Sequence, residues 1–127
     1  MTLHVALVVP DRELWSGQAS TVIAKTSEGD IGVLTGHSPV FGVLTEGSVA
    51  EIVTDENRVR AAVSGGFLSV ADDRVSILAA QAELAGEINV EQTRAELAAA
   101  LAEATPGAED SPAVRYARAR LRAAGQD

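Results

Sequence analysis

The sequence lacks cysteine altogether, which excludes disulfide bonds, thiol catalysis and thiolate metal sites. Aromatic residues make up only 3% of the 127 residues, so platforms that stack on bases or sugars are not expected. No apolar stretch approaches the about 20 residues of a membrane-spanning helix, and no cationic start followed by an apolar run marks a secretory signal. We therefore expect a soluble cytoplasmic protein, either one domain or a small domain with an appendage.

Positive charge is also scarce. The formal net charge of -8 argues against nucleic-acid binding, because phosphates favour clustered Lys and Arg. From Ser111 onward, however, Asp127 is the only acidic residue, and the basic residues are Arg115, Arg118, Arg120 and Arg122. An acidic body with a basic tip indicates a tip that meets an acidic partner. A solvated helix with arginines near its negative C-terminal end would give the same pattern, so both interpretations stay open.

Short strands separated by turns are predicted for residues 1–84. Leu3, Val5, Leu7 and Val9 alternate with their neighbours, which is the period of a half-buried strand. The segment 13–17 is predicted as a turn in which Trp15 is a large anchor. Further strands are expected at 21–24, 31–34, 40–44, 49–53, 59–63, 68–70 and 75–77, with turns at 10–11, 55–57, 65–66 and 72–73. Because no helix interrupts these strands, we expect a flattened antiparallel β sandwich.

A two-helix hairpin is predicted for residues 85–127, where alanine becomes abundant. Asn89 can cap the first helix, with Gln92 three residues later as in a capping box. Ser111 followed by Pro112 marks the start of the second helix. The expected apolar faces are Val90, Leu97 and Leu101 on the first helix, and Val114, Ala117, Leu121 and Ala124 on the second. The fold class is therefore β + α, with a sandwich domain at 1–84 and a helical hairpin at 85–127.

The predicted hairpin has little to bury. Its first helix is filled mainly with alanine, which removes less apolar area from water than leucine does, at roughly 25 cal/mol per Å2. Helices of about 13 to 15 residues are marginal alone in water. We therefore expect the position of the hairpin to depend on contacts with the sheet or with a partner. Arg115, Arg118 and Arg122 share one face beside the apolar stripe of the second helix.

Candidate catalytic residues are few. His4 and His37 lack the H-E-x-x-H spacing that places two imidazoles on one metal ion. His37 is close in sequence to Asp30 and Ser38, but no Gly-x-Ser-x-Gly elbow presents a nucleophile. We interpret His37 as a turn or contact residue, and we expect no catalytic, cofactor-binding or metal site.

Several glycine-marked motifs follow one another in the first two thirds of the chain. They are Leu3-His4-Val5, Ser16-Gly17, Gly29-Asp30-Ile31-Gly32, Gly36-His37-Ser38-Pro39, Val63-Ser64-Gly65-Gly66-Phe67 and Val75-Ser76-Ile77-Leu78-Ala79. In this order and spacing they resemble the ε subunit family of the bacterial F-type ATP synthase. The resemblance is strongest between Leu3 and Ala82 and weaker in the helices. It implies the same fold, a flattened β sandwich followed by a helical hairpin.

The resemblance also implies a role and partners. Members of the family are non-catalytic rotor subunits of the central stalk, where they couple transmembrane proton flow to ATP synthesis. The sandwich lies between the γ subunit and the c-subunit ring. On this basis Glu28, Gly29, Asp30 and His37 are the candidates for ring contact. The protein would then be peripheral at the cytoplasmic face of the cell membrane, and would meet the membrane only through the complex.

The hairpin resembles the regulatory element of the family. Arg115, Arg118 and Arg122 would approach an acidic segment of the β subunit, or of the α subunit, and restrain ATP hydrolysis. Some relatives bind ATP on the hairpin through a motif like Ile-Asp-x-x-Arg-Ala. Here Asn89 replaces the Asp, and two extra residues precede Arg94, so we expect weak or absent ATP binding. The sequence leaves open whether the hairpin is folded down or extended.

Two other function classes remain as alternatives. The chain would be a stand-alone binding module if it displayed its arginine-striped helix to an acidic protein without γ. It would be a small hydrolase if His37 and neighbouring carboxylates formed an active site. Association with a γ subunit distinguishes the first alternative, and the effect of replacing His37 on any activity of the isolated chain distinguishes the second.

Overall fold

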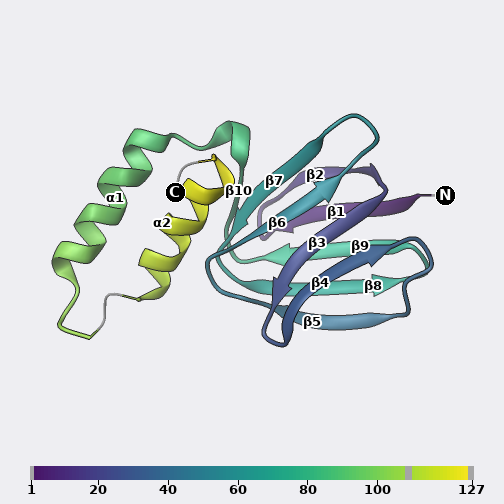
Figure 1. The fold of residues 1–127 in the computed structure, drawn as a ribbon, viewed down its shortest axis with the longest axis horizontal. Coiled ribbons are helices and arrows are strands. Elements are labelled where there is room, and N and C mark those ends of the chain that lie inside the picture. The colour runs from purple at the N-terminus through teal and green to yellow at the C-terminus, as the bar shows by residue number, and fades with distance from the viewer. Residues whose placement is uncertain (1, 108–109, 126–127) are drawn as a thin grey trace.

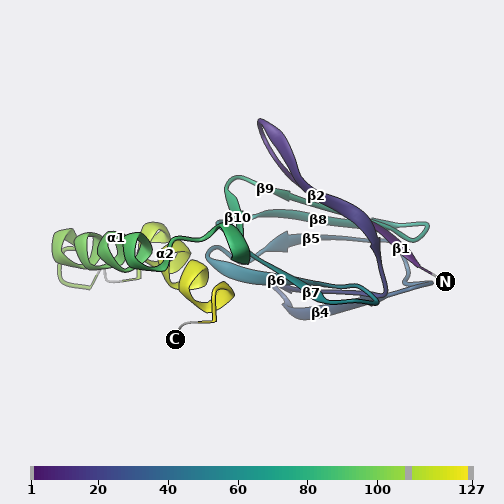
Figure 2. The same ribbon diagram turned by 90° about the horizontal axis from the view of Figure 1, so that it is seen from above.

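One continuous sheet folds over on itself into two layers, and two helices lie at one end of the resulting sandwich (Figures 1 and 2). The computed structural model describes residues 2–107 and 110–125. The predicted β sandwich followed by a two-helix hairpin is confirmed. In chain order the described elements are β1 (Leu3–Val9), β2 (Arg12–Ala19), β3 (Thr21–Thr26), β4 (Gly29–Leu34), β5 (Val40–Leu44), β6 (Ser48–Val53), β7 (Arg58–Val63), β8 (Gly66–Ala71), β9 (Arg74–Ala79), β10 (Ala82–Leu84), the 3-10 helix η1 (Ala85–Glu87), α1 (Val90–Glu103) and α2 (Pro112–Ala123).

The strand order is β10-β7-β6-β3-β5-β8-β9-β1-β2, and β4 pairs with β3 outside this path. The two layers join where β3 meets β5, through the single pair Thr26 and Leu44. The pairs are antiparallel except one, because β1 lies parallel to β9, from His4 beside Arg74 to Val8 beside Leu78. The expected antiparallel sandwich is confirmed with this one exception, which arises because the first strand inserts between β9 and β2 instead of pairing only with its neighbour in sequence.

The core follows the predicted alternation of β1. Leu3, Val5, Leu7 and Val9 are at most 9% exposed, while the residues between them are not buried. The opposite layer contributes buried apolar side chains to the same cluster, among them Val22, Val33 and Ile52. One apolar face per strand therefore fills the space between the layers, as expected for a sandwich.

The segment around Trp15 is a strand, and its prediction as a turn was wrong. Residues of β2 pair antiparallel with β1 through a register that shifts between Leu7 and Val8, which leaves Leu14 as the extra residue of a bulge. The indole of Trp15 lies over Gly17, where a Cβ would come 3.2 Å from the ring. The ladder offered by β1 outweighs the turn preference of this short polar segment.

Both helices begin where the sequence predicted. The side chain of Asn89 accepts a hydrogen bond from the Gln92 amide at 2.9 Å, but the Gln92 side chain donates to Glu96 instead of completing the capping box. The Ser111 side chain accepts from the Val114 amide at 3.3 Å. Within the described residues, neither helix is long and apolar enough to cross a membrane.

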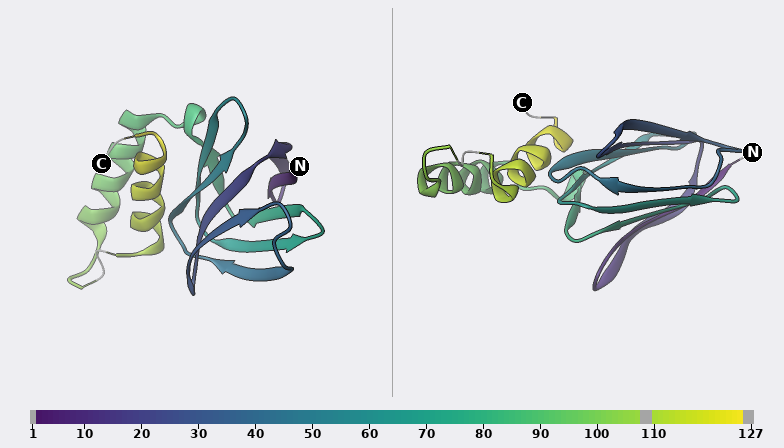
Figure 3. Two further views of the ribbon diagram at one scale, coloured as in Figure 1. Left: turned by 45° about the vertical axis from the view of Figure 1, so that its right-hand side comes forward. Right: turned by 90° about the horizontal axis from the view of Figure 1, so that it is seen from below.

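Helix α2 lies between α1 and the sandwich, so it is buried on two opposite sides (Figure 3). One side is the predicted stripe of Val114, Ala117 and Leu121, but Ala124 is a half-buried cap rather than part of it. The second side was not predicted. There Ala119 and Ala123 form a cluster with the fully buried Ala62 of β7. On α1 the buried residue is Thr93, whereas the predicted Val90, Leu97 and Leu101 are half-buried.

The start of β8 depends on a glycine. Gly66 has a φ of +138°, and a Cβ there would overlap the carbonyl oxygen of Leu78 and come 2.8 Å from the Cα of Ala79. We expect Gly66→Ala to lower the free energy of unfolding of the sandwich by about 2–4 kcal/mol, because it adds backbone strain to a clash. Urea unfolding followed by the fluorescence of Trp15 measures this change. The matched control is Gly32→Ala, where nothing lies within 4 Å of the new methyl group, and a loss as large in the control would contradict the explanation.

Candidate functional site

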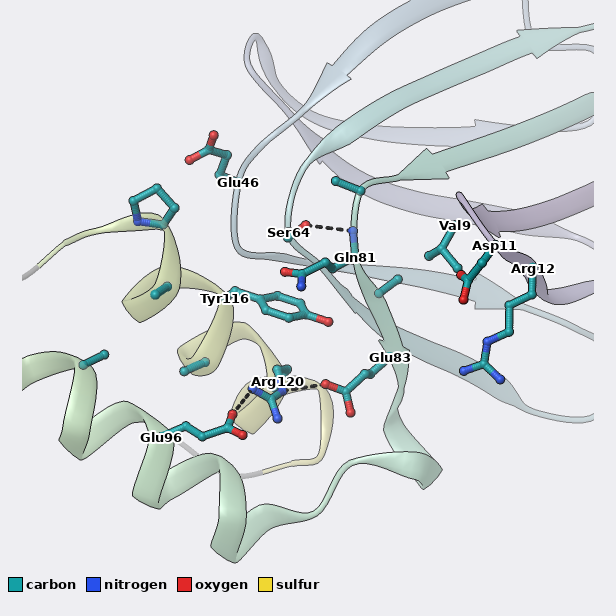
Figure 4. Close-up of a pocket in the computed structure, with 16 residues that line it drawn as sticks. Val9, Asp11, Arg12, Glu46, Ser64, Gln81, Glu83, Glu96, Tyr116 and Arg120 are labelled. Atoms are coloured by element: carbon teal, nitrogen blue, oxygen red, sulfur yellow. Dashed lines mark hydrogen bonds and ion pairs between the residues drawn. The ribbon is translucent and has the colours of Figure 1, made fainter.

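The hairpin is fastened to the sandwich by Arg120 of α2 (Figure 4). Its Nε lies 2.7 Å from Oε1 of Glu83 on β10, at an angle that makes the contact an ion pair rather than an aligned hydrogen bond. Its Nη1 donates to Oε2 of Glu96 on α1 at 2.5 Å. The guanidinium carbon is 5.4 Å from the centre of the Tyr116 ring, a cation–π distance. One side chain, only 12% exposed, thus joins three elements.

A hollow of about 960 Å³ opens beside this ion-pair network, between the hairpin and the sandwich. Burial, followed by the nearby charge of Glu83, raises the pKa of Tyr116 to about 12. The charged lining is mostly acidic and consists of Asp11, Glu46, Glu83 and Glu96 against Arg12 and Arg120. A polyphosphate would meet net repulsion here, because four carboxylates face two guanidinium groups and Arg120 is already paired with Glu83 and Glu96.

A second contact joins α2 to the turn between β5 and β6. Gly47 in this turn is buried with a φ of +66°, and a Cβ there would overlap the backbone of Arg115. The carbonyl oxygen of Gly47 accepts a hydrogen bond from Nη2 of Arg122 at 3.1 Å. Only a residue without a side chain lets the turn approach the helix this closely.

The three predicted regulatory arginines lie together along one exposed side of α2, as their spacing required. Arg115 donates to Oδ2 of Asp110 at 2.8 Å, and this hydrogen bond lowers the pKa of Asp110 and raises the pKa of Arg115. Arg122 is engaged with Gly47. Arg118 forms no ion pair with any residue that the structure describes. These three residues, which we call the arginine stripe, point away from Arg120.

The predicted ring-contact residues fall into two groups. Glu28, Gly29 and Asp30 are exposed at the turn between β3 and β4. In this turn the Thr26 hydroxyl donates to the Gly29 carbonyl at 2.8 Å and accepts from the Glu28 amide at 3.2 Å. Asp30 also lines a hollow of about 450 Å³ together with Arg122, so this turn lies on the side of the sandwich where the hairpin docks.

His37 lies beyond the opposite end of β4. Asp30 is the second residue of this strand, so at about 3.3 Å per residue it lies roughly 13 Å from Leu34, to whose carbonyl oxygen the His37 amide donates in the turn that follows. The loop of His37 is held by the Asp73 carboxylate, which accepts from the Gly36 amide at 2.6 Å. Nδ1 of the His37 ring lies 2.7 Å from the carbonyl oxygen of its neighbour Ser38. The structure therefore does not assemble His37 with Asp30, and no cluster suited to a metal ion exists among residues 2–107 and 110–125.

An exposed apolar surface, which was not predicted from the sequence, covers the outer side of one layer. Val43, Phe67, Leu78 and Val8 are cross-strand neighbours in a row over β5, β8, β9 and β1. Phe41 stacks on Phe67 with ring centres 5.3 Å apart, and these rings are 66% and 45% exposed. We call these five residues the apolar face. The sequence does contain a signal for this face. Both Phe residues occupy positions of β5 and β8 that alternate with the buried, inward-facing positions.

Comparison with known proteins identifies the family to which these surfaces belong. A family model described as ATP synthase, Delta/Epsilon chain, beta-sandwich domain matches residues 2–85. An ATP synthase epsilon chain from Thermobifida fusca (strain YX) is 54% identical over 125 aligned residues, with 96% of this chain and 91% of that relative covered. The chain belongs to the ATP synthase epsilon chain family. A second epsilon chain, from Streptomyces coelicolor, is 50% identical over 122 residues and covers 96% and 94% of the two chains.

Solved structures share the fold. A chain in the cryo-EM structure of the Euglena gracilis mitochondrial ATP synthase, OSCP/F1/c-ring, superposes with a TM-score of 0.79 at 23% identity, covering 98% of this chain and 82% of that one. A chain in the central stalk and c-ring structure from Tetrahymena thermophila gives a TM-score of 0.60 at 18% identity, with 98% and 91% covered. The family resemblance drawn from the sequence is confirmed, and all the motifs that carried it lie within the matched residues 2–85.

The single tyrosine of this epsilon-family chain reports whether the hairpin is docked. Because the pKa of Tyr116 is raised from 10.0 to about 12, the docked state favours the protonated phenol. We therefore expect tyrosinate absorbance to appear with a midpoint near pH 12, and docking to weaken as the pH rises from 10 to 12. Ultraviolet titration of the intact chain measures the midpoint. The Tyr116→Phe variant should lack the weakening of docking that ionisation of the phenol causes at alkaline pH. A midpoint near 10 in the folded chain would contradict the burial of Tyr116.

Proposed function

We propose that the chain is a non-catalytic rotor subunit in the central stalk of an F-type ATP synthase and couples transmembrane proton flow to ATP synthesis. The observation that carries this proposal is the apolar face on a chain of the epsilon family. A row of cross-strand apolar residues, with two stacked Phe rings left in water, is typical of a surface that a partner covers. Among the described residues there is no assembled catalytic constellation that would favour an enzymatic function instead.

The γ subunit is the partner that we assign to the apolar face. Aromatic residues at the centre of a contact contribute most of its binding energy, and Phe41 and Phe67 are the most prominent aromatic residues outside the core. The opposite layer offers a less suitable surface. Its outer side carries Glu51 with Arg58 and Arg60, and these three residues are already joined by ion pairs of 2.8 and 3.3 Å.

We assign the c-subunit ring to the exposed turn of Glu28, Gly29 and Asp30, whose carboxylates suit basic groups on a polar loop. His37 can touch the same ring only if β4 lies along it, because the strand separates the two groups. Among the described residues β4 pairs with β3 alone, so its other edge is available for such a contact. The protein would then be peripheral at the cytoplasmic face of the membrane.

The hairpin is the regulatory part in this proposal, with residues 1–84 as the sandwich domain and 85–127 as the hairpin. When extended, the arginine stripe would meet an acidic segment of the β or α subunits and restrain ATP hydrolysis, because guanidinium groups pair well with carboxylates. The described structure has the hairpin folded down. We also propose that ATP binds weakly or not at all, since the Asn89 side chain is engaged as a helix cap and the hollow nearby is mostly acidic.

The assignment of γ to the apolar face predicts that Phe41→Asp and Phe67→Asp each weaken association with a cognate γ subunit. The expected loss is about 30-fold, or roughly 2 kcal/mol, as for other aromatic anchors. Gel filtration of the mixed chains detects the one-to-one complex, and titration gives its affinity. The matched control is Ile23→Asp, another exposed apolar residue on the other layer, which should bind normally. No association of the unchanged chain in mild salt would favour the stand-alone binding module.

The regulatory role predicts that truncation after Ala85 leaves assembly intact and raises ATP hydrolysis by the complex. Replacing Arg115, Arg118 and Arg122 together by Ala should give much of the same rise, roughly two- to tenfold, since exposed ion pairs are individually weak. High salt should mimic the substitutions. Arg74→Ala, an exposed arginine of β9, is the control. Hydrolysis that stays unchanged after truncation would show that the hairpin does not restrain the motor.

A further inference from the structure

We propose that Glu83, Arg120 and Glu96 form an internal latch that keeps the hairpin folded against the sandwich. The latch joins α2 to β10 on one side and to α1 on the other through the 2.7 and 2.5 Å contacts of one guanidinium. Since α1 is connected to β10 only through η1 and its short flanking segments, fixing both carboxylates to the same arginine sets the position of the whole hairpin (Figure 4).

The surroundings of Arg120 make this pairing specific to the folded-down position. Its side chain is 12% exposed and stacks on Tyr116, whose ring also packs against the Ala62 cluster of the sandwich. A charge in such a place needs its counter-charges, because water reaches it poorly. Glu83 and Glu96 come from different elements, so their meeting at Arg120 exists only while α1, α2 and β10 are together.

The latch also reduces repulsion among the carboxylates at this end of the sandwich. The hollow beside it holds two further carboxylates, from Asp11 and Glu46, so without Arg120 the acidic groups would repel one another across the gap. In the described state the positive charge that joins them comes from the chain itself.

Helix α2 thus carries two sets of arginines with opposite effects. Arg120 faces inward and holds the hairpin down, whereas the arginine stripe lies on another, exposed side of the helix, where Arg115 pairs with Asp110 and Arg122 donates to Gly47. Under the function proposed above, weakening the latch should favour restraint of hydrolysis, and removing the stripe should relieve it. The carboxylates are the better residues to change, because Glu83→Gln with Glu96→Gln leaves every arginine of α2 in place.

The test uses the full chain, in which the absence of native cysteine allows two labels to be placed freely. Spin labels at Glu56→Cys, in the turn between β6 and β7, and at Ala99→Cys, on the exposed side of α1, report the distance between sandwich and hairpin. We expect one compact population in the parent chain. The E83Q/E96Q variant should show about a tenfold larger fraction of long distances, because loss of both counter-charges removes the attraction that is specific to the closed state.

Arg118→Ala is the matched control, since it removes an exposed arginine of the same helix without touching the latch. Unchanged fluorescence of Trp15 shows that the sandwich stays folded in each variant, which separates an opened hairpin from an unfolded chain. A compact population in E83Q/E96Q equal to that of the parent would overturn the latch. So would an Arg118→Ala chain that opens as far as E83Q/E96Q.

A second measurement separates the latch from the regulatory role on which it builds. In the assembled complex E83Q/E96Q should lower ATP hydrolysis, opposite in sign to the triple arginine substitution. A hairpin that opens in the isolated chain while hydrolysis by the complex stays the same would support the latch and reject the restraint of hydrolysis. A hairpin that stays closed in the isolated chain rejects the latch, whatever the complex does.

Discussion

The close approach of helix α2 to strand β7 is the constraint on which the rest of the hairpin depends. Ala62 is fully buried under the helix, although its neighbours Ala61 and Val63 point into the core of the sandwich. Small side chains on both sides, Ala62 on the strand and Ala119 on the helix, bring the two backbones together. Because helix α2 lies so close to β7, Arg120 on the helix can reach Glu83 on the neighbouring strand β10. A larger residue at 62 would move the helix outward and separate every polar contact that depends on it.

The docking surface is therefore defined by shape and charge more than by apolar area. Alanine clusters bury little surface, and the contact at Gly47 is a backbone approach rather than a hydrophobic one. Ion pairs at the edge of such a surface add orientation, because a planar guanidinium accepts its partners only from certain directions. A small net stability is what a movable element requires, since segments that change position belong to the less stable part of a structure.

Much of the fold was predictable because local patterns and burial agree. The alternation of Leu3, Val5 and Leu7 matches their burial, and the caps at Asn89 and Ser111 begin the two helices. The parallel pairing of β1 with β9 was not predictable, since nothing local in β1 marks a partner so distant in sequence. The second buried side of α2 was missed for another reason: alanine fits an exposed and a buried helical position equally well.

The site was predictable only where its residues share one element. The common face of Arg115, Arg118 and Arg122 follows from helical spacing. By contrast, the counter-charges of Arg120 come from two other elements, and Asp30 and His37, although close in sequence, are separated by most of strand β4. The apolar face was not predicted because Phe41 and Phe67 are apolar like the residues of the core, and only their exposure separates the two sets.

The parallel pairing of β1 with β9 also limits when the sheet can form during synthesis. The first strand leaves the ribosome early, yet its neighbour on one side is among the last strands of the sandwich to be synthesised. Until then β1 pairs only with β2, and its other edge, which β9 will occupy, stays open. Closure of the sheet is thus a late, non-local event, of the kind that slows folding. The hairpin helices emerge later still, so they dock on a sandwich whose last strand has just been set in place.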